Sequence, residues 1–226
     1  MCALSQRKTT FIRKYCMKLF TSPRAPNPKR VRMFMAEKGL ADDAIELVNV
    51  DLNTNQHKTP DFVLKSAMSR IPALELDDGR MLCESRAICT YLEALYPAPN
   101  LMGETGEQRA FIEMTDRYVE WYIMIPLAMW IRHTHPGLAV LEGTQFPDFG
   151  QNQAPKFEAG VQWLDGQLAK HDWVAGDVFS IADITAFCAL EFARLAKFKA
   201  ADKGFANVAR WHATMSQRAS APAGNA

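Results

Sequence analysis

The chain has 226 residues, 48% of them hydrophobic, and its 26 basic and 25 acidic side chains nearly cancel. This length is enough for one large domain or for two small ones with separate cores. The balanced charge, without a basic stripe, gives no reason to expect a nucleic-acid partner. No apolar run is long enough to span a bilayer, so we expect no membrane partner either.

The cysteine pattern predicts reduced thiols. The five cysteines are Cys2, Cys16, Cys83, Cys89 and Cys188. They form no C-x-x-C pair, and their spacing suits neither a zinc site nor a disulfide framework, so we expect no metal. Cys83, Cys89 and Cys188 lie in apolar stretches, where a buried and inert thiol is the simplest role. The pattern favours a reducing compartment, and hence a cytoplasmic protein.

The N-terminal part of the chain divides into an extension and a domain. Residues 1–16 have neither periodicity nor the apolar segment of a secretory signal, so we interpret them as a flexible extension. Residues 17–97 alternate between strand and helix patterns, which predicts a mixed sheet with helices. The predicted strands are 18–21, 45–50, 71–76 and 81–83. One helix follows the proline-rich turn at 22–28, and we expect Ser85 to cap another.

The C-terminal part is predicted to be helical. Residues 98–106 are rich in Pro, Asn and Gly and form a linker, and residues 107–218 form an all-helical domain. Its first helix should run over about 107–133 with a kink at Pro126. The small and polar residues 219–226 predict a disordered tail.

A capping box marks the start of one buried helix. Ser180 and Asp183 have the spacing at which each side chain bonds the other's backbone amide. Phe179 and Ile184 occupy the two positions of a hydrophobic staple around it. We therefore predict a helix from residue 181 to about residue 196.

Two segments of the first domain point to a peptide ligand. Pro72 opens a strand, where its missing N–H is tolerated. If the Ile71–Pro72 bond is cis rather than trans, the backbone N–H and C=O of Ile71 turn outward and can pair with a peptide. Glu84 and Ser85 stand at a helix start, where amides, a hydroxyl and an anion suit the α-carboxylate and α-ammonium of an amino-acid head group. We predict the cis bond.

These segments resemble a known family. Ser69–Leu74 and Glu84–Ile88 are similar to the glutathione-site signature of the cytosolic glutathione transferases, and Phe179–Asp183 resembles their helical-domain capping motif. Pro23–Arg32 is similar to the first strand, turn and helix of bacterial and fungal members, nearest to the Gtt-like subgroup. The resemblance covers about 17–217. It implies a thioredoxin-like N-terminal domain, an all-helical C-terminal domain and a cytoplasmic homodimer.

The resemblance also implies roles in binding glutathione. Glu84 and Ser85 would hold the γ-glutamyl end, and Ile71 would pair its backbone with the cysteinyl part. Arg70 would stand near the tripeptide.

The glycine end of glutathione needs a cation or a free N–H. The resemblance assigns this role to His57 or Lys58. Without the resemblance, His57 and Lys58 are interpreted equally well as solvated loop side chains.

The thiolate needs a donor, because the thiolate and not the thiol is the nucleophile. The position that holds serine in many relatives falls at Ala25 or Pro26, neither of which has a donor, so Asn27 is the nearest candidate. Relatives of this subgroup imply a second candidate on the long helix, His133, which could accept a proton near neutrality.

The resemblance implies an enzyme that conjugates glutathione, its co-substrate, to a small apolar electrophile. A glutathione-dependent disulfide-bond reductase and a non-catalytic binding protein with the same fold are the alternatives. Four further residues have a helical spacing that suits an electrophile pocket, a core or a subunit interface. They are Trp121, Tyr122, Met124 and Trp130.

Overall fold

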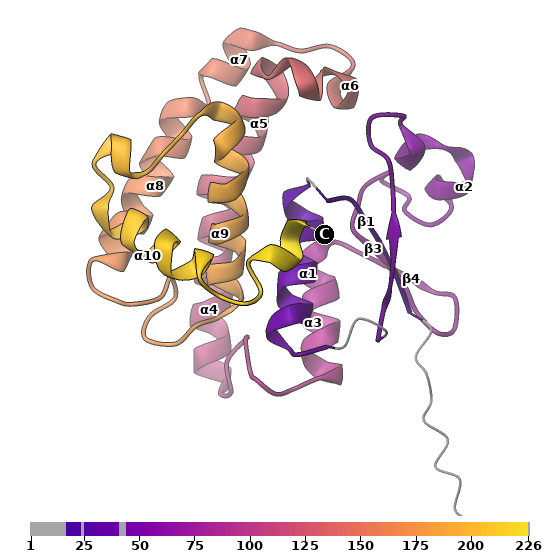
Figure 1. The fold of residues 1–226 in the computed structure, drawn as a ribbon, viewed down its shortest axis with the longest axis horizontal. Helices are drawn as coiled ribbons and strands as arrows, with labels where there is room; N and C mark the ends of the chain where they lie inside the picture. Colours follow the sequence, from indigo (N-terminus) through magenta and orange to yellow (C-terminus); the bar gives the residue numbers. More distant parts are fainter. Residues whose placement is uncertain (1–16, 24, 41–43, 226) are drawn as a thin grey trace, which may run out of the picture.

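The computed structural model describes residues 17–23, 25–40 and 44–225 (Figure 1). The expected extension at 1–16 lies outside the described residues. The chain folds into a sheet with helices, followed by a larger body of helices, as the sequence predicts.

The first part contains the four predicted strands within the described residues. They are β1 (Lys18–Thr21), β2 (Glu46–Asn49), β3 (Ala73–Glu75) and β4 (Met81–Cys83). Their order in the sheet is β2-β1-β3-β4, with β2 parallel to β1 and the other neighbours antiparallel. In this register Leu19 of β1 lies between Leu47 and Leu74.

Helices flank this sheet. They are α1 (Pro26–Glu37), the 3-10 turn η1 (Gln56–Lys58), the short α2 (Pro60–Val63) and α3 (Ser85–Leu95). The buried faces of α1 and α3 include Phe34 and Leu92, which belong to a core that continues into the helical part.

The helical part follows the linker. Its longer helices are α4 (Gly106–Val119), α5 (Ile125–Thr134), α8 (Ala154–Leu168), α9 (Ile181–Ala193) and α10 (Ala206–Ser216). Shorter turns are η2 (Glu120–Met124), η3 (Pro136–Leu138), α6 (Ala139–Glu142), α7 (Pro147–Gln151), η4 (Arg194–Ala196), η5 (Ala201–Lys203) and η6 (Pro222–Asn225). Helix α9 is buried along almost its whole length and packs against both α1 and α4.

The capping box at the start of α9 is confirmed. The Ser180 amide donates to Asp183 Oδ2 at 3.0 Å, and the reciprocal bond from the backbone to the Ser180 side chain is present as well. Asp183 Oδ1 also accepts from the Val174 amide at 2.9 Å and from Trp211 Nε1 at 3.0 Å. The buried carboxylate therefore joins three segments of the helical part.

The predicted tail differs from the structure. Ser220 is 3% exposed, Ala221 is 8% exposed, and residues 222–225 form η6 instead of a disordered end. Figure 1 shows this segment lying beside α1. Polar bonds to α1 and the small side chains allow close packing, which composition alone does not reveal.

The predicted kink at Pro126 takes the form of a π-helical segment, η2, directly before it. In an α-helix the Tyr122 carbonyl would accept from residue 126, which as proline has no N–H, and a π turn accommodates that loss. Gly160 of α8 packs against this carbonyl, because a Cβ there would lie 2.1 Å from Tyr122 O. The interrupted helix and α8 therefore fit only because residue 160 has no side chain.

We predict that Gly160→Ala destabilises the fold by at least about 1–3 kcal/mol, because the clash is with backbone and forces a shift. Gly166→Ala on the same helix is the matched control, since a Cβ there meets nothing within 4 Å. It should stabilise by up to about 1 kcal/mol through helix propensity. Urea unfolding measures both, and equal stability of the two variants would contradict the packing described.

Candidate functional site

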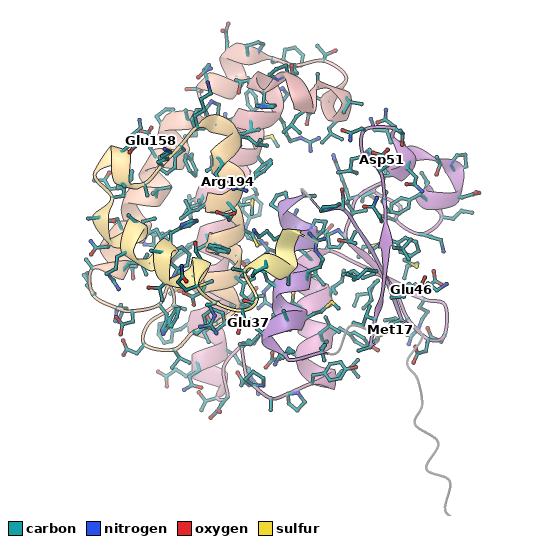
Figure 2. All side chains as sticks on the ribbon, viewed as in Figure 1. Met17, Glu37, Glu46, Asp51, Glu158 and Arg194 are labelled. Carbon is teal, nitrogen blue, oxygen red and sulfur yellow. The ribbon has the colours of Figure 1, made fainter. Side chains whose placement is uncertain are left out.

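A cleft of about 1530 Å³ lies between the sheet and the helical part. Its walls come from the β1–α1 turn, the segments 49–53 and 66–72, the start of α3, and α5, α9 and the turns after α5. Asp51 and Arg194 line it from facing sides (Figure 2). Six of the residues predicted for the site line this cleft. They are Asn27, His57, Arg70, Ile71, Glu84 and Ser85.

The Ile71–Pro72 bond is cis, as predicted. Both residues line the cleft, and within the described parts of the chain no hydrogen bond uses the N–H or the C=O of Ile71. A backbone donor and acceptor on a cleft wall are suited to pairing with an extended peptide.

The start of α3 corrects one prediction. The residue at the N-cap is Glu84, not Ser85, and its φ of 70° is a rare conformation for a residue with a side chain. Ser85 is the first residue of the helix, and its Oγ accepts from Arg30 Nη1 at 3.0 Å. Because an arginine only donates, this bond leaves the Ser85 proton free for an acceptor in the cleft.

Arg30 connects this helix start to the helical part. It is 1% exposed, and Nη1 also reaches Glu120 Oε1 of η2 at 2.5 Å. A second buried contact lies alongside. Asp116 accepts from Arg86 Nε at 2.8 Å and from Thr185 Oγ1 of α9 at 2.5 Å. The first turn of α3 is therefore fixed to η2, α4 and α9 by charged hydrogen bonds.

The structure brings His57, but not Lys58, into the cleft. His57 is 3% exposed, and its Nδ1 has no hydrogen-bond partner within the described chain. Burial, followed by the charges of Lys58, Arg70 and Arg132, lowers the pKa of His57. The ring is therefore neutral at pH 7, with one N–H to donate. Lys58 is exposed, and its Nζ lies 3.4 Å from the Val140 carbonyl.

The β1–α1 turn carries Asn27 at the second position of α1, with its side chain exposed on the cleft. Pro26 and Pro28 have no N–H, and the amide of Lys29 donates to the Ala25 carbonyl at 3.1 Å. The first turn of α1 therefore offers a ligand mainly the side chain and amide of Asn27.

His133 does not lie in the cleft. It is 9% exposed, its Nδ1 accepts from the Phe146 amide at 3.2 Å, and its ring centroid lies 5.1 Å from that of Phe149. On α5 the residues that line the cleft are Ile125, Ala128, Met129 and Arg132. The structure does not bring His133 together with the other predicted site residues, because its ring packs on Phe146 and Phe149.

The wall of the cleft next to α5 and α9 has an apolar part beside the charged side chains of Arg132, Glu142, Glu191 and Arg194. Its apolar members are Met124, Ile125, Ala128, Met129, Leu138, Leu141, Phe192 and Leu195. Of the four residues suggested for an electrophile pocket, only Met124 lines it. Trp121 and Tyr122 are exposed outside it, and Trp130 packs on Phe157.

Sequence reasoning missed a charged group on the α9 side. Glu191 lies 3.5 Å from Lys29 Nζ, 3.4 Å from Arg194 Nη2 and 3.1 Å from His212 Nε2. The hydrogen bond from His212, opposed by burial and aided by the three positive neighbours, lowers the pKa of Glu191 to about 2. The signal that could have revealed this group is a charged residue, Glu191, within the otherwise apolar sequence of α9.

Cys89 and Cys188 are buried, and burial raises the pKa of each thiol to about 12, which agrees with the inert role predicted for them. Cys83, predicted to be buried as well, is only half-buried and lines the cleft. Within the described residues no group of three or more His, Cys, Asp or Glu side chains could hold a metal ion. In the same part of the chain, no helix combines the length and apolar character needed to cross a membrane.

Fold and cleft together define a class of proteins in which a thioredoxin-like domain is followed by a helical domain. Comparison with known families identifies it. Residues 19–100 match the N-terminal domain model of glutathione S-transferases, and residues 127–214 match the C-terminal domain model. The chain belongs to the glutathione S-transferase family.

Comparison with individual relatives shows which members of the family the chain resembles. The chain is 34% identical over 208 residues to glutathione S-transferase 2 of Saccharomyces cerevisiae, covering 92% of this chain and 88% of that relative. The crystal structure of Gtt2 from the same yeast matches with a TM-score of 0.85 and 33% identity, over 90% of this chain and 98% of that one. A glutathione S-transferase domain-containing protein of Marinobacter aquaeolei has a TM-score of 0.85 and 35% identity, over 90% and 99%. The resemblance to Gtt-like members is confirmed.

Proposed function

We propose that this chain is a glutathione transferase that binds glutathione in the cleft and directs its thiolate at a small apolar electrophile. Glutathione is the co-substrate of the family. The observation that carries the proposal is the pair formed by the unpaired backbone of Ile71 and the Ser85 hydroxyl held by Arg30. Together they suit a peptide strand that ends in an amino-acid head group.

The γ-glutamyl end would lie at the start of α3. Its carboxylate would accept from the Ser85 hydroxyl and from helix amides, which the helix dipole favours. Its ammonium would face the carboxylate of Glu84. The cysteinyl part would pair with the backbone of Ile71, and Arg70 would stand beside the tripeptide as a cation.

The glycine carboxylate would accept from neutral His57. The buried and unpaired ring nitrogen supports this choice over Lys58. Lys58 would add only long-range positive potential, since it lies outside the cleft lining.

The sulfur would lie at the β1–α1 turn, beside Asn27. A free thiol has a pKa near 8.5, so the site must favour the anion. Within the described residues the Asn27 side chain and amide have no hydrogen-bond acceptor, so both would donate to the thiolate and favour it. His133 has no part in this proposal.

The second substrate would occupy the apolar wall between α5 and α9, where Met124, Met129 and Phe192 present adaptable surface. We also propose a cytoplasmic location, which the free cysteines of the described part of the chain support.

A disulfide-bond reductase is the second candidate. The observation that favours it is Asn27 at the sulfur position, with no cysteine in the described first turn of α1, so that glutathione itself would exchange with a disulfide. Assays with aryl halides, epoxides and isothiocyanates against small disulfides separate the two. Glutathione binding without turnover of any of them would instead indicate the non-catalytic binding protein.

We also propose a homodimer. The outer face of α4 and η2 carries an apolar stripe at helical spacing, and a second exposed apolar group follows α2. The stripe consists of Phe111, Met114, Tyr118, Trp121, Tyr122 and Ile125, and the second group of Leu64 and Met68. Leu64 is 86% exposed and Trp121 is 62% exposed, and a second copy of the chain would bury both.

We predict that Ser85→Ala weakens glutathione binding by about 1.5–3 kcal/mol, because a hydrogen bond to a charged group is lost. Titration calorimetry measures this. Ser216→Ala removes an equivalent hydroxyl from α10, outside the cleft, and should bind glutathione like wild type. If Ser85→Ala binds glutathione with unchanged affinity, Ser85 does not hold the γ-glutamyl carboxylate.

We predict that Asn27→Ala raises the apparent pKa of bound glutathione by about one unit, because a donor to the anion is lost while the neutral thiol loses less. The affinity for glutathione at low pH should stay nearly constant. Titration of the thiolate absorbance between pH 5 and pH 9 measures both. The matched control is Asn207→Ala on α10, and a wild-type curve for Asn27→Ala would exclude this residue as the donor.

We predict that Trp121→Glu converts the dimer to a monomer, because it introduces a charge into the centre of the apolar stripe. Sedimentation equilibrium measures the mass. Val178→Glu, at a residue 66% exposed outside the stripe, should leave the dimer intact. A wild-type chain that sediments as a monomer would contradict the proposal outright.

A further inference from the structure

Arg32 is a buried arginine on α1 that holds the exit of β1. It is 3% exposed, and its Nη1 donates to Thr21 Oγ1 and to the Ser22 carbonyl, the latter at 3.2 Å. Its Nη2 donates to the Pro23 carbonyl at 3.3 Å. One planar guanidinium therefore fixes three consecutive residues at the start of the β1–α1 turn.

These contacts lead directly to the place where the sulfur is proposed to bind. The Ser22 carbonyl, held by Arg32, also accepts from the Ala25 amide at 3.4 Å. Ala25 is the N-cap of α1, and Asn27 follows two residues later. Ser22, Pro23, Ala25 and Asn27 all line the cleft. A movement of the Arg32 guanidinium would therefore be transmitted to Asn27 through only two hydrogen bonds and a short stretch of chain.

Another bond of Arg32 reaches the other end of the chain. Its Nε donates to the Ala223 carbonyl at 3.1 Å, 191 positions later in the sequence. Figure 1 shows the last described turn, η6, beside α1. The C-terminal segment, defined here as residues 217–223, is thus part of the framework around the turn.

This segment is held firmly on α1. Arg218 donates to Glu37 through Nε at 2.7 Å and Nη2 at 2.8 Å, and Ser220 Oγ donates to the same carboxylate at 2.5 Å. Glu37 lies on α1 beneath the segment (Figure 2). The Arg218 guanidinium also stacks 3.8 Å from the centroid of the Phe179 ring. Bidentate and stacked arginine contacts have a fixed geometry, so the segment has a defined position.

We propose that Arg32 is a positioning residue of the sulfur site and that the C-terminal segment holds it in place. The proposal rests on the function given above, in which the thiolate of glutathione lies beside Asn27. The C-terminus contributes to catalysis without touching the substrate, because its Ala223 carbonyl orients the guanidinium that shapes the turn.

The test combines two measurements on the full chain. Arg32→Lys keeps the charge, but its single ammonium has only three donors on one nitrogen. It cannot serve the four acceptors that the guanidinium reaches, which are Thr21 Oγ1 and the carbonyls of Ser22, Pro23 and Ala223. Ser220→Ala loosens the C-terminal segment without touching Arg32 and is the milder variant should Arg32→Lys fold poorly. Hydrogen exchange followed by mass spectrometry reads the backbone amides present within residues 22–27, where Pro23 and Pro26 have none, with no need for glutathione. The most informative amide is that of Ala25, which donates to the Ser22 carbonyl. Thiolate absorbance gives the apparent pKa of bound glutathione, and calorimetry gives its affinity.

We expect faster exchange at residues 22–27 in both variants. We also expect the apparent pKa of bound glutathione to rise by about one unit in Arg32→Lys, with a much smaller change in affinity. The thiolate fraction at neutral pH then falls by at most about tenfold. Arg109→Lys is the matched control, because Arg109 also donates to backbone carbonyls, those of Gly103 and Glu104, but outside the cleft. It should change neither quantity.

Unchanged exchange at residues 22–27 in both variants would overturn the proposal, whatever the substrate is. Faster exchange with a wild-type thiolate pKa would overturn it as well, because the turn would then move without affecting the sulfur. A wild-type protein that forms no glutathione thiolate would contradict the proposed function instead, and the exchange rates alone would then decide whether the C-terminal segment holds the turn.

Discussion

Arg30 is a cation completely enclosed by protein, and the geometry of the candidate site depends on how it is satisfied. Removing a guanidinium from water costs several kcal/mol unless it is paired. Here Nη1 meets both Ser85 and Glu120, while Nε and Nη2 find no partner within the described chain. The bond from Arg30 therefore fixes the orientation of the Ser85 hydroxyl. The bond from Arg30 to Glu120 holds the sheet and the helical part together at this point.

Helix α1 is the element that joins the other parts of the site. Its N-terminus presents Asn27 to the cleft, Arg30 reaches α3 and η2, and Arg32 reaches the turn and the C-terminus. Near its end, Glu37 anchors Arg218 and Ser220. The apolar residues between them, such as Phe34, pack into the core shared by both parts of the chain. Polar residues on several sides of one buried helix explain why it can connect a peptide site, a sulfur site and the C-terminus.

Local signals in the sequence predicted most of the fold and only part of the site. The four strands and the capping box at Ser180 depend on neighbouring residues and were predicted correctly. The cis bond before Pro72 was also predicted correctly, but from the helix start at Glu84 and Ser85 later in the chain. The failures depend on tertiary contacts. Ser85 was expected to cap its helix, but Arg30, 55 positions earlier, occupies its hydroxyl oxygen. The direction in which His133 points depends on its packing against α7, and the position of the C-terminal segment depends on its bonds to Glu37 of α1. No local pattern in the sequence encodes either contact.

The measurement that tests this account most directly is a crystal structure of the protein with glutathione. The account predicts the γ-glutamyl carboxylate within about 2.7 Å of the Ser85 hydroxyl and the cysteinyl backbone paired with Ile71, at ordinary hydrogen-bond distances. It also predicts the sulfur beside Asn27, with Arg30 still bonded to Ser85. Glutathione bound elsewhere in the cleft, or bound there with Ser85 and Ile71 making no contact to it, would contradict the account.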